Sequence, residues 1–121
     1  MKEITTTDEL DEVMSGDRPA VIDFWGPTCG PCLAMAPVYE ALAEHYGEEP
    51  IDFYKVNTSV APQVAAAFNV RSIPTFIFVL EGEVVDHNIG GCEPQRLSKK
   101  VDRLLSKSRG ETFLSRLFGG K

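Results

Sequence analysis

The chain has 121 residues and a mass of 13.3 kDa, a length that suits one domain and leaves no room for two. Its 43% hydrophobic and 25% charged residues are ordinary for a soluble globular protein, and no stretch approaches the roughly 18 apolar residues of a membrane span. The net charge of −6 excludes a general nucleic-acid binder, which needs a basic surface, and three cysteines are too few for a small domain held together by disulfides.

Charge is distributed unevenly along the chain. Residues 1–105 contain 17 acidic and 8 basic side chains, whereas residues 106–121 contain one acidic and four basic ones. The sequence therefore predicts an acidic body with a short basic tail. Its start lacks the charged segment, apolar segment and cleavage site of a secretory leader, so we expect a cytoplasmic protein.

The first half of the chain predicts a helix, a strand, a second helix and a second strand. The first helix begins near Thr7 and ends at Gly16, since threonine caps helix starts and glycine helix ends. Residues 20–25 (AVIDFW) are apolar on both faces, which is typical of a central strand. Residues 30–46 then form a helix and residues 51–57 a strand parallel to the first. The apolar residues that recur along the long helix are Leu33, Val38, Leu42 and Tyr46.

The second half predicts a short helix over residues 60–68, then strands over 75–80 and 83–89 and a last helix from Glu93 onward. Glu81 and Gly82 make the tight turn of an antiparallel hairpin. The product is an α/β fold with a central mixed sheet of four or five strands and helices on both faces. The buried residues expected on the last helix are Leu97, Val101, Leu104 and Leu105.

Cys29 and Cys32 lie three apart, between the first predicted strand and the long helix. A thiolate is the reactive form of cysteine, and its pKa falls at a helix N-terminus, where free amides favour negative charge. Two structural thiols or half of a metal site are the alternatives. A zinc site normally needs four ligands, and the remaining candidates, His45, His87 and Cys92, stand alone. The spacing therefore favours redox chemistry, with no metal and no bound cofactor.

The segment WGPTCGPCLAMAP resembles the active site of the thioredoxin family, and VIDFW resembles the strand that enters it. The likeness continues through Lys55, Ile73-Pro74-Thr75 and Gly90-Gly91, over residues 1–107. It implies a thioredoxin-like fold and a protein-disulfide reductase, in which Cys29 attacks a protein disulfide and Cys32 resolves the mixed disulfide. It also implies re-reduction by a thioredoxin reductase-like donor and a monomer that binds no nucleic acid.

Two charged residues complete the catalytic set that we expect. Asp23 shares its strand face with apolar Val21 and Trp25, which favours burial, although a solvent-exposed face is the alternative. Burial raises the pKa of a carboxyl group, so Asp23 is a candidate proton acceptor for Cys32. Lys55 on the adjacent strand is expected to tune that charge, or else is an ordinary exposed strand lysine.

The resemblance also implies a substrate groove. It gives Pro74 a preceding cis peptide bond beside the disulfide, although an isolated proline is more often trans. Trp25 is expected to flank the disulfide loop, or to be a plain core aromatic, and the two glycines after the last strand could form an ordinary turn. The residues expected to bind substrate are Trp25, Gly30, Pro31, Ile73, Pro74, Gly90 and Gly91.

This chain departs from the usual family pattern near the cysteines. Thr28 replaces a common aromatic residue, Leu33 a common basic one, and Ser59 stands where an acid is frequent. These changes bear on partner choice and redox potential, and leave the dithiol chemistry intact. Cys92 is the odd thiol, which we expect to pack as a small apolar residue, with a regulatory or resolving thiol as the alternative.

Residues 108–121 form a tail beyond the thioredoxin domain of residues 1–107, with Phe113, Leu114, Leu117 and Phe118 on one helical face. We expect the tail to dock on the body or to stay free, without membrane contact. Two other functions stay open on the sequence: a disulfide oxidase or isomerase, and a partner-binding module with little turnover. A metal cluster bridging two chains is a more distant alternative.

Overall fold

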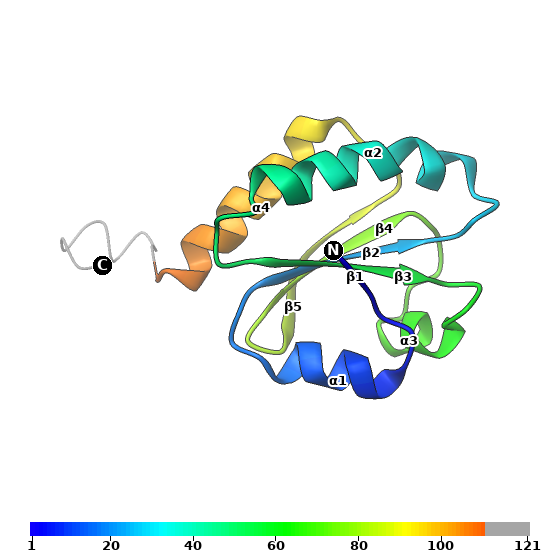
Figure 1. The fold of residues 1–121 in the computed structure, drawn as a ribbon, viewed down its shortest axis with the longest axis horizontal. Helices are drawn as coiled ribbons and strands as arrows, with labels where there is room; N and C mark the ends of the chain where they lie inside the picture. The colour runs from blue at the N-terminus through cyan, green and yellow to red at the C-terminus, as the bar shows by residue number, and fades with distance from the viewer. Residues whose placement is uncertain (111–121) are drawn as a thin grey trace.

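The computed structural model describes residues 1–110, which form a five-stranded sheet in the order β1-β3-β2-β4-β5 (Figure 1). β2 pairs in parallel with β3, and β3 pairs in parallel with β1, whereas β4 runs antiparallel to both β2 and β5. The predicted mixed sheet is confirmed. The strands are β1 (Lys2–Glu3), β2 (Ala20–Trp25), β3 (Asp52–Asn57), β4 (Thr75–Leu80) and β5 (Glu83–Ile89).

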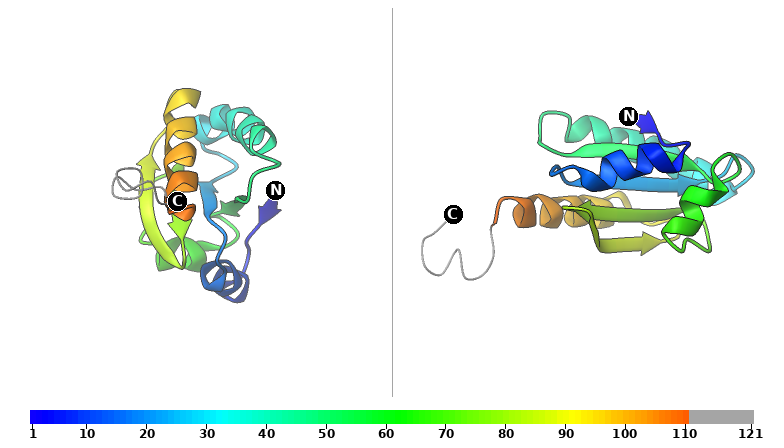
Figure 2. Two further views of the ribbon diagram at one scale, coloured as in Figure 1. Left: turned by 90° about the vertical axis from the view of Figure 1, so that its left-hand side faces the viewer. Right: turned by 90° about the horizontal axis from the view of Figure 1, so that it is seen from below.

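Within residues 1–110, four helices cover the sheet in two layers, one on each face as predicted (Figure 1). α2 and α4 lie along one face and α1 and α3 along the other (Figures 1 and 2). No helix among residues 1–110 is long and apolar enough to cross a bilayer. The helices are α1 (Thr7–Ser15), α2 (Gly30–His45), α3 (Pro62–Ala67) and α4 (Pro94–Ser108).

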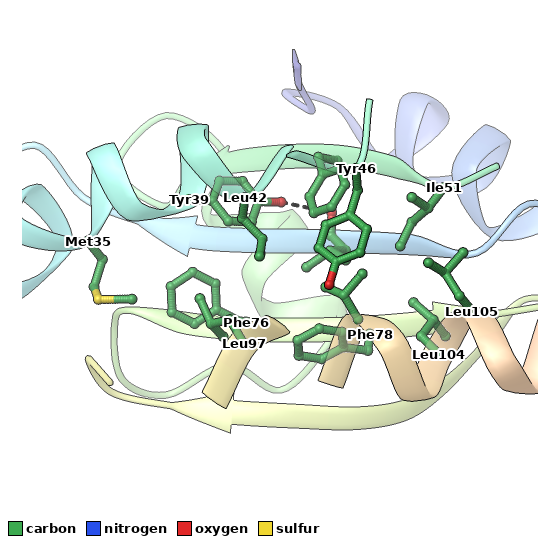
Figure 3. Close-up of a cluster of buried hydrophobic side chains, with 13 residues drawn as sticks. Met35, Tyr39, Leu42, Tyr46, Ile51, Phe76, Phe78, Leu97, Leu104 and Leu105 are labelled. Carbon is green, nitrogen blue, oxygen red and sulfur yellow. Dashed lines mark hydrogen bonds between the residues drawn. The ribbon is translucent and has the colours of Figure 1, made fainter. Parts of the chain in front are cut away.

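The side chains of β2 point alternately to the two faces of the sheet and contribute to two separate core clusters. Val21 joins the cluster beneath α2 and α4, where Tyr39 and Phe76 are completely buried (Figure 3). Ile22 and Phe24 point to the opposite face and join the cluster beneath α1 and α3. Successive strand side chains point to opposite faces, so a strand that is apolar at nearly every position must be covered on both. β2 is therefore the central strand that its sequence predicts.

The apolar stripe predicted for the long helix is wrong at Leu33, which is 52% exposed. Five residues separate Leu33 from Val38, which is not a whole number of helical turns, so the two side chains point in different directions. The buried residues of α2 recur three or four apart and are Cys32, Met35, Tyr39 and Leu42.

β1 was not predicted from the sequence. It has only two residues, too few for a period to show. It is held in place by the next residue, Ile4, which is 1% exposed and donates its backbone N–H to the Lys55 carbonyl at 2.8 Å. This strand places Glu3 opposite Lys55.

Of the tail predicted for residues 108–121, only residues 108–110 are described. Ser108 completes α4, one residue beyond the predicted domain boundary, and Arg109 donates to Glu49 at 2.8 Å. The predicted apolar face of Phe113, Leu114, Leu117 and Phe118 lies outside the described residues.

Candidate active site

The topology brings three loops together at one end of the sheet, where β2 and β5 finish and β4 begins. β2 ends there and leads through Gly26 into α2, and because β4 runs antiparallel to β2, the Ile73-Pro74 segment before β4 lies at the same end. The segment after β5, which begins with Gly90, arrives there too, and the Gly90 N–H donates to the Pro74 carbonyl at 2.7 Å. Residues that are far apart in the sequence thus meet around the start of α2.

The two cysteines form a disulfide in the first turn of α2, with their Cα atoms 5.2 Å apart. Cys29 is the N-cap residue and is half-buried, and its Sγ accepts the Cys32 backbone N–H at 3.2 Å. Cys32 lies inside the helix and is 3% exposed. Free amides and the helix dipole at this end favour a negative charge on Cys29 when the disulfide is opened.

Asp23 is buried in the middle of β2, with 2% of its surface exposed. Its Oδ1 has no hydrogen-bond partner among the described residues. Burial raises the pKa of this carboxyl group to about 7, against an opposing effect of Lys55 and with a smaller contribution from Glu3 in the same direction as burial. The group can therefore take up and release a proton near neutral pH, and the expected burial is confirmed.

Lys55 is directly paired with Asp23 across β2 and β3. Its Nζ lies 4.6 Å from the ring centroid of Trp25, a cation–π contact that holds the ammonium over the indole. The indole Nε1 is buried and has no acceptor among residues 1–110. Lys55 and Trp25 thus form one unit beside the buried carboxyl group.

Ile73 and Pro74 are joined by a cis peptide bond, as the family resemblance implies. The Ile73 carbonyl oxygen lies 3.8 Å from Cys29 Sγ. A Cβ on Gly26 would lie 2.9 Å from Ile73 Cδ1, so any larger residue here would displace the end of the Ile73 side chain. The Ile73-Pro74 segment is therefore packed directly beside the cysteine pair.

The glycines of the predicted groove occupy different surroundings. Gly90 has a φ of 92°, a left-handed conformation that favours glycine, and open space where a Cβ would stand. A Cβ on Gly91 would lie 3.7 Å from Met35 Cγ, which places this residue beside α2. Gly30 and Pro31 are exposed in the first turn of α2. Their roles in substrate binding stay predictions.

Sequence reasoning missed two polar residues that are connected to the site, Glu3 beside Lys55 and Asn88 beside Gly90. Glu3 pairs with Lys55 on the far side from Asp23, and the short β1 gave no pattern that could have revealed it. Asn88 is 5% exposed, donates to the Gly90 carbonyl at 3.1 Å and accepts from Arg96 Nε at 2.6 Å. Apolar and polar residues do not alternate regularly along β5, so the burial of Asn88 could not be predicted from the sequence.

The third cysteine takes no part in the disulfide. Cys92 is half-buried and packs against the core cluster under α2 and α4, as predicted, and burial raises the pKa of its thiol. Within the described part of the chain, no group of three or more histidine, cysteine or acidic side chains could hold a metal ion.

Comparison with known proteins gives consistent results. A family model described as Thioredoxin matches residues 1–103. The chain is 38% identical to a thioredoxin of Porphyra purpurea over 106 residues, 88% of this chain and 98% of that one. It is 39% identical to thioredoxin 1 of Nostoc sp. over 103 residues (85% and 95%), and 41% identical to a chloroplastic M-type thioredoxin of Pisum sativum over 98 residues (81% and 55%).

The fold has equally similar solved structures. The crystal structure of Malassezia sympodialis thioredoxin superposes with a TM-score of 0.80 at 31% identity, covering 87% of this chain and 90% of that one. The X-ray structure of Fasciola hepatica thioredoxin gives 0.78 at 32% identity, covering 85% and 98%.

Proposed function

The chain belongs to the thioredoxin family and is a protein-disulfide reductase of the thiol–disulfide oxidoreductase class, and we propose residue roles for its reaction. The contrast between the cysteines supports these roles. Cys29 is half-buried at the N-cap of α2, whereas Cys32 is 3% exposed within the helix. A substrate disulfide can thus reach Cys29, which makes Cys29 the attacking thiolate and Cys32 the resolving thiol.

The reaction proceeds in two exchanges that move two electrons to the substrate. The Cys29 thiolate attacks one sulfur of the target disulfide, forms a mixed disulfide and releases the other target sulfur as a thiolate, which takes a proton from water. The Cys32 thiol then loses its proton and attacks Cys29 Sγ. This step releases the second target thiolate and leaves the Cys29–Cys32 disulfide, which an external dithiol donor of the reductase class reduces again.

Asp23 accepts the Cys32 proton in this proposal. A pKa of about 7 leaves a substantial fraction of the carboxyl group ionised at neutral pH, so it can take up a proton without being too weak a base. Transfer by way of a bound water is compatible with the unpartnered Oδ1. Lys55 limits how far burial raises this pKa, and its contact with Trp25 fixes where its charge sits.

We further propose that an extended substrate segment lies along the Ile73-Pro74 loop. The approach of the Ile73 carbonyl to Cys29 Sγ supports this path, because a backbone placed beside that loop comes within reach of the attacking sulfur. Gly90 and Gly91 form the far wall, and the open space at Gly90 lets a main chain come close. Trp25, Gly30 and Pro31 complete the groove from the β2–α2 side.

The setting of the enzyme is also a proposal. We place it in the cytoplasm, because the acidic composition of residues 1–105 is typical of cytoplasmic proteins. We also propose that it is a monomer. The chloroplastic M-type relatives make a plastid the alternative location. Gel filtration of the full chain and cell fractionation test these two statements directly.

Trapping experiments test the residue roles. Cys32→Ser, mixed with a disulfide-bonded peptide, is expected to stop as a covalent adduct at Cys29, whereas Cys29→Ser gives no adduct. Mass spectrometry of the digested adduct identifies the linked cysteine, and Cys92→Ser serves as the matched control that leaves turnover intact. An adduct at Cys92, or persistent turnover by Cys29→Ser, would overturn the assignment. Partner binding that survives Cys29→Ser without any turnover in the wild type would favour the binding-module alternative.

A further inference from the structure

Basic side chains in the described part of the chain are concentrated on α4 and the two residues that follow it. Residues 94–110 carry six basic side chains and one acidic one, whereas residues 1–93 carry four basic and sixteen acidic ones. Five of the six recur at spacings of three or four residues, which places them on one side of the helix. We call these the basic face of α4: Arg96, Lys99, Lys100, Arg103 and Lys107.

Local acids do not neutralise the basic face. Asp86 on β5 accepts from Lys100 Nζ at 2.9 Å and lies 3.9 Å from Arg103, and Glu93 precedes the helix. Asp102 points to another side of α4, where it accepts from the Tyr46 hydroxyl at 2.6 Å. Lys99 and Lys107 are exposed and have no ion-pair partner among residues 1–110. Five cations and two nearby acids leave a positive surface on an acidic protein.

The basic face begins at the candidate active site. Arg96 donates to Asn88, a neutral amide that leaves the guanidinium charge in place. Asn88 donates to the Gly90 carbonyl, and the Gly90 N–H donates to the Pro74 carbonyl. α4 runs next to β5 toward the opposite end of the molecule from the start of α2 (Figure 2). Lys100, Arg103 and Lys107 line a pocket together with Val85 and Asp86 of β5. A partner bound at Cys29 can therefore extend directly onto the basic face.

We propose that the basic face of α4 is a docking surface for an acidic segment of the protein whose disulfide is reduced at Cys29. This inference deepens the proposed function, since it names the charge of the preferred substrate. Exposed pairs between these cations and carboxylates add little to affinity individually, and together they speed the encounter and orient the partner. A polyphosphate chain is disfavoured as the occupant, because a polyanion longer than this one helix would meet the rest of a chain in which residues 1–93 carry sixteen acidic and four basic side chains.

The proposal makes a prediction opposite to that of net charge. A protein with a formal charge of −6 would on average repel acidic substrates and attract basic ones. If the basic face governs docking, a substrate with acidic residues beside its disulfide is instead reduced faster than its neutral or basic counterparts. The preference must fade as salt screens the charges.

The test uses one disulfide-bonded peptide extended by alternating Glu-Gly, Ser-Gly or Lys-Gly segments. With the wild type at low salt, we expect kcat/KM for the Glu-Gly peptide to exceed that for the Ser-Gly peptide by about fivefold, and the difference to vanish near 0.5 M salt. K99Q/R103Q/K107Q should remove the preference. The matched control K2Q/R18Q/R109Q deletes three charges elsewhere and should keep it.

Reduction of 2-hydroxyethyl disulfide, a small uncharged substrate, separates this inference from the proposed function. All variants are expected to reduce it at the wild-type rate, and loss of that activity in the wild type would contradict the reductase roles instead. The docking proposal is overturned if the Glu-Gly peptide has no advantage in the wild type, or if K99Q/R103Q/K107Q keeps the advantage. Salt-sensitive binding of a short DNA duplex to the basic face, without any Glu-Gly advantage, would also overturn it.

Discussion

Asp23 and Lys55 are directly paired across β2 and β3, yet no ion pair joins their side chains in the described part of the chain. The ammonium of Lys55 lies over the Trp25 ring instead, and the Asp23 carboxyl group keeps one oxygen without a partner. A close ion pair would hold the carboxyl group ionised and make it a poor proton acceptor. In the observed arrangement, the Lys55 charge is near enough to limit the rise in the pKa of Asp23, and the carboxyl group can still accept a proton near neutral pH.

Asp23→Asn is expected to stabilise the oxidised protein at alkaline pH. The folded pKa of about 7 lies above that of an unfolded aspartate, so the stability due to Asp23 is complete below pH 4 and is lost as the pH rises toward 7. Roughly three pH units correspond to at most about 4 kcal/mol in the free energy of unfolding. Urea unfolding of both proteins from pH 4 to 9 measures the difference, which should be largest at and above pH 8.

The control for this experiment is Asp11→Asn, which removes an exposed carboxyl group from α1. Its unfolding curve should follow that of the wild type across the same pH range. If the difference in stability between Asp23→Asn and the wild type also stays constant from pH 4 to 9, the carboxyl group does not titrate abnormally and its role as proton acceptor is lost. The same variant should slow release of the substrate from the mixed disulfide.

Lys55 and Glu3 are expected to shift the titration of Asp23 in opposite directions. Removing the Lys55 charge raises the pKa of Asp23, because that charge favours the carboxylate, and removing the Glu3 charge lowers it. Tyr39 is the other titratable group close to Asp23 in the oxidised protein, and burial raises its own pKa well above the usual value, so it stays neutral. Carbon-13 NMR of the Asp23 carboxyl group in K55Q and E3Q measures both shifts.

Lys2→Gln is the matched control, because Lys2 pairs with Tyr54 and its side chain therefore points to the opposite face of β1 from that of Glu3. We expect shifts of a few tenths of a pH unit for E3Q, a larger one for K55Q and none for K2Q. Shifts of the same sign in K55Q and E3Q would contradict the arrangement. An E3Q effect that persists in 1 M salt would point to a structural change rather than a charge effect.

The sequence predicts most of the sheet because β2, β4 and β5 are longer than five residues and have turn signals at their ends. It also predicts the burial of Asp23, since the residues two before and two after it are apolar. The pairing of Glu3 with Lys55 could not be predicted from these patterns, because the register of two strands depends on contacts between segments that are distant in the sequence. The hydrogen bonds from Arg96 to Asn88 and from Asn88 to the Gly90 carbonyl also depend on contacts between segments that the sequence pattern does not relate.

The family resemblance supplied what periodicity could not. A cis bond before Pro74 has no local sequence signature in this chain, and it was expected only from the motif around it. At Leu33 the helical pattern and the resemblance point in opposite directions: the pattern includes Leu33 among the apolar residues of the helix, whereas the basic residue that is common at this position in the family favours exposure. The position of Leu33 in the first turn of α2, directly after buried Cys32, turns it toward solvent.

The reduction potential of the Cys29–Cys32 pair is expected below about −250 mV, in the range of cytosolic disulfide reductases. A pair becomes oxidising when its thiolate is strongly stabilised, and residues 26–33 contain no charged side chain that could add to the effect of the helix N-terminus. Thiol trapping in defined glutathione or dithiothreitol buffers gives the value. A potential above about −200 mV would contradict the reductase direction and support the oxidase or isomerase alternative.

Leu33→Lys should raise that potential by about 10 to 20 mV, because a cation in the first turn of α2 stabilises the nearby Cys29 thiolate by up to about 1 kcal/mol. The matched control Ala41→Lys adds the same charge to an exposed position more than two turns further along α2. Equal shifts in both variants would assign the effect to net charge rather than to the thiolate.

Tyr39 is expected to contribute to stability through its hydroxyl group, separately from catalysis. This side chain is completely buried, and its hydroxyl group lies 3.0 Å from the Val21 carbonyl and 2.7 Å from the Tyr54 carbonyl, so it links α2 to β2 and β3. Tyr39→Phe removes the donor and leaves both acceptors in place. The expected loss is about 1 to 2 kcal/mol in the free energy of unfolding, measured by urea titration.

Tyr54→Phe is the matched control, because the Tyr54 ring is only half-buried and its hydroxyl group has no hydrogen bond among residues 1–110. It should unfold within about 0.5 kcal/mol of the wild type, as surface substitutions usually do. If the stability of Tyr39→Phe is also unchanged, the ladder of β2 and β3 satisfies both carbonyls without help from α2. Turnover of 2-hydroxyethyl disulfide should be similar in both variants, because neither hydroxyl group contacts the cysteine pair.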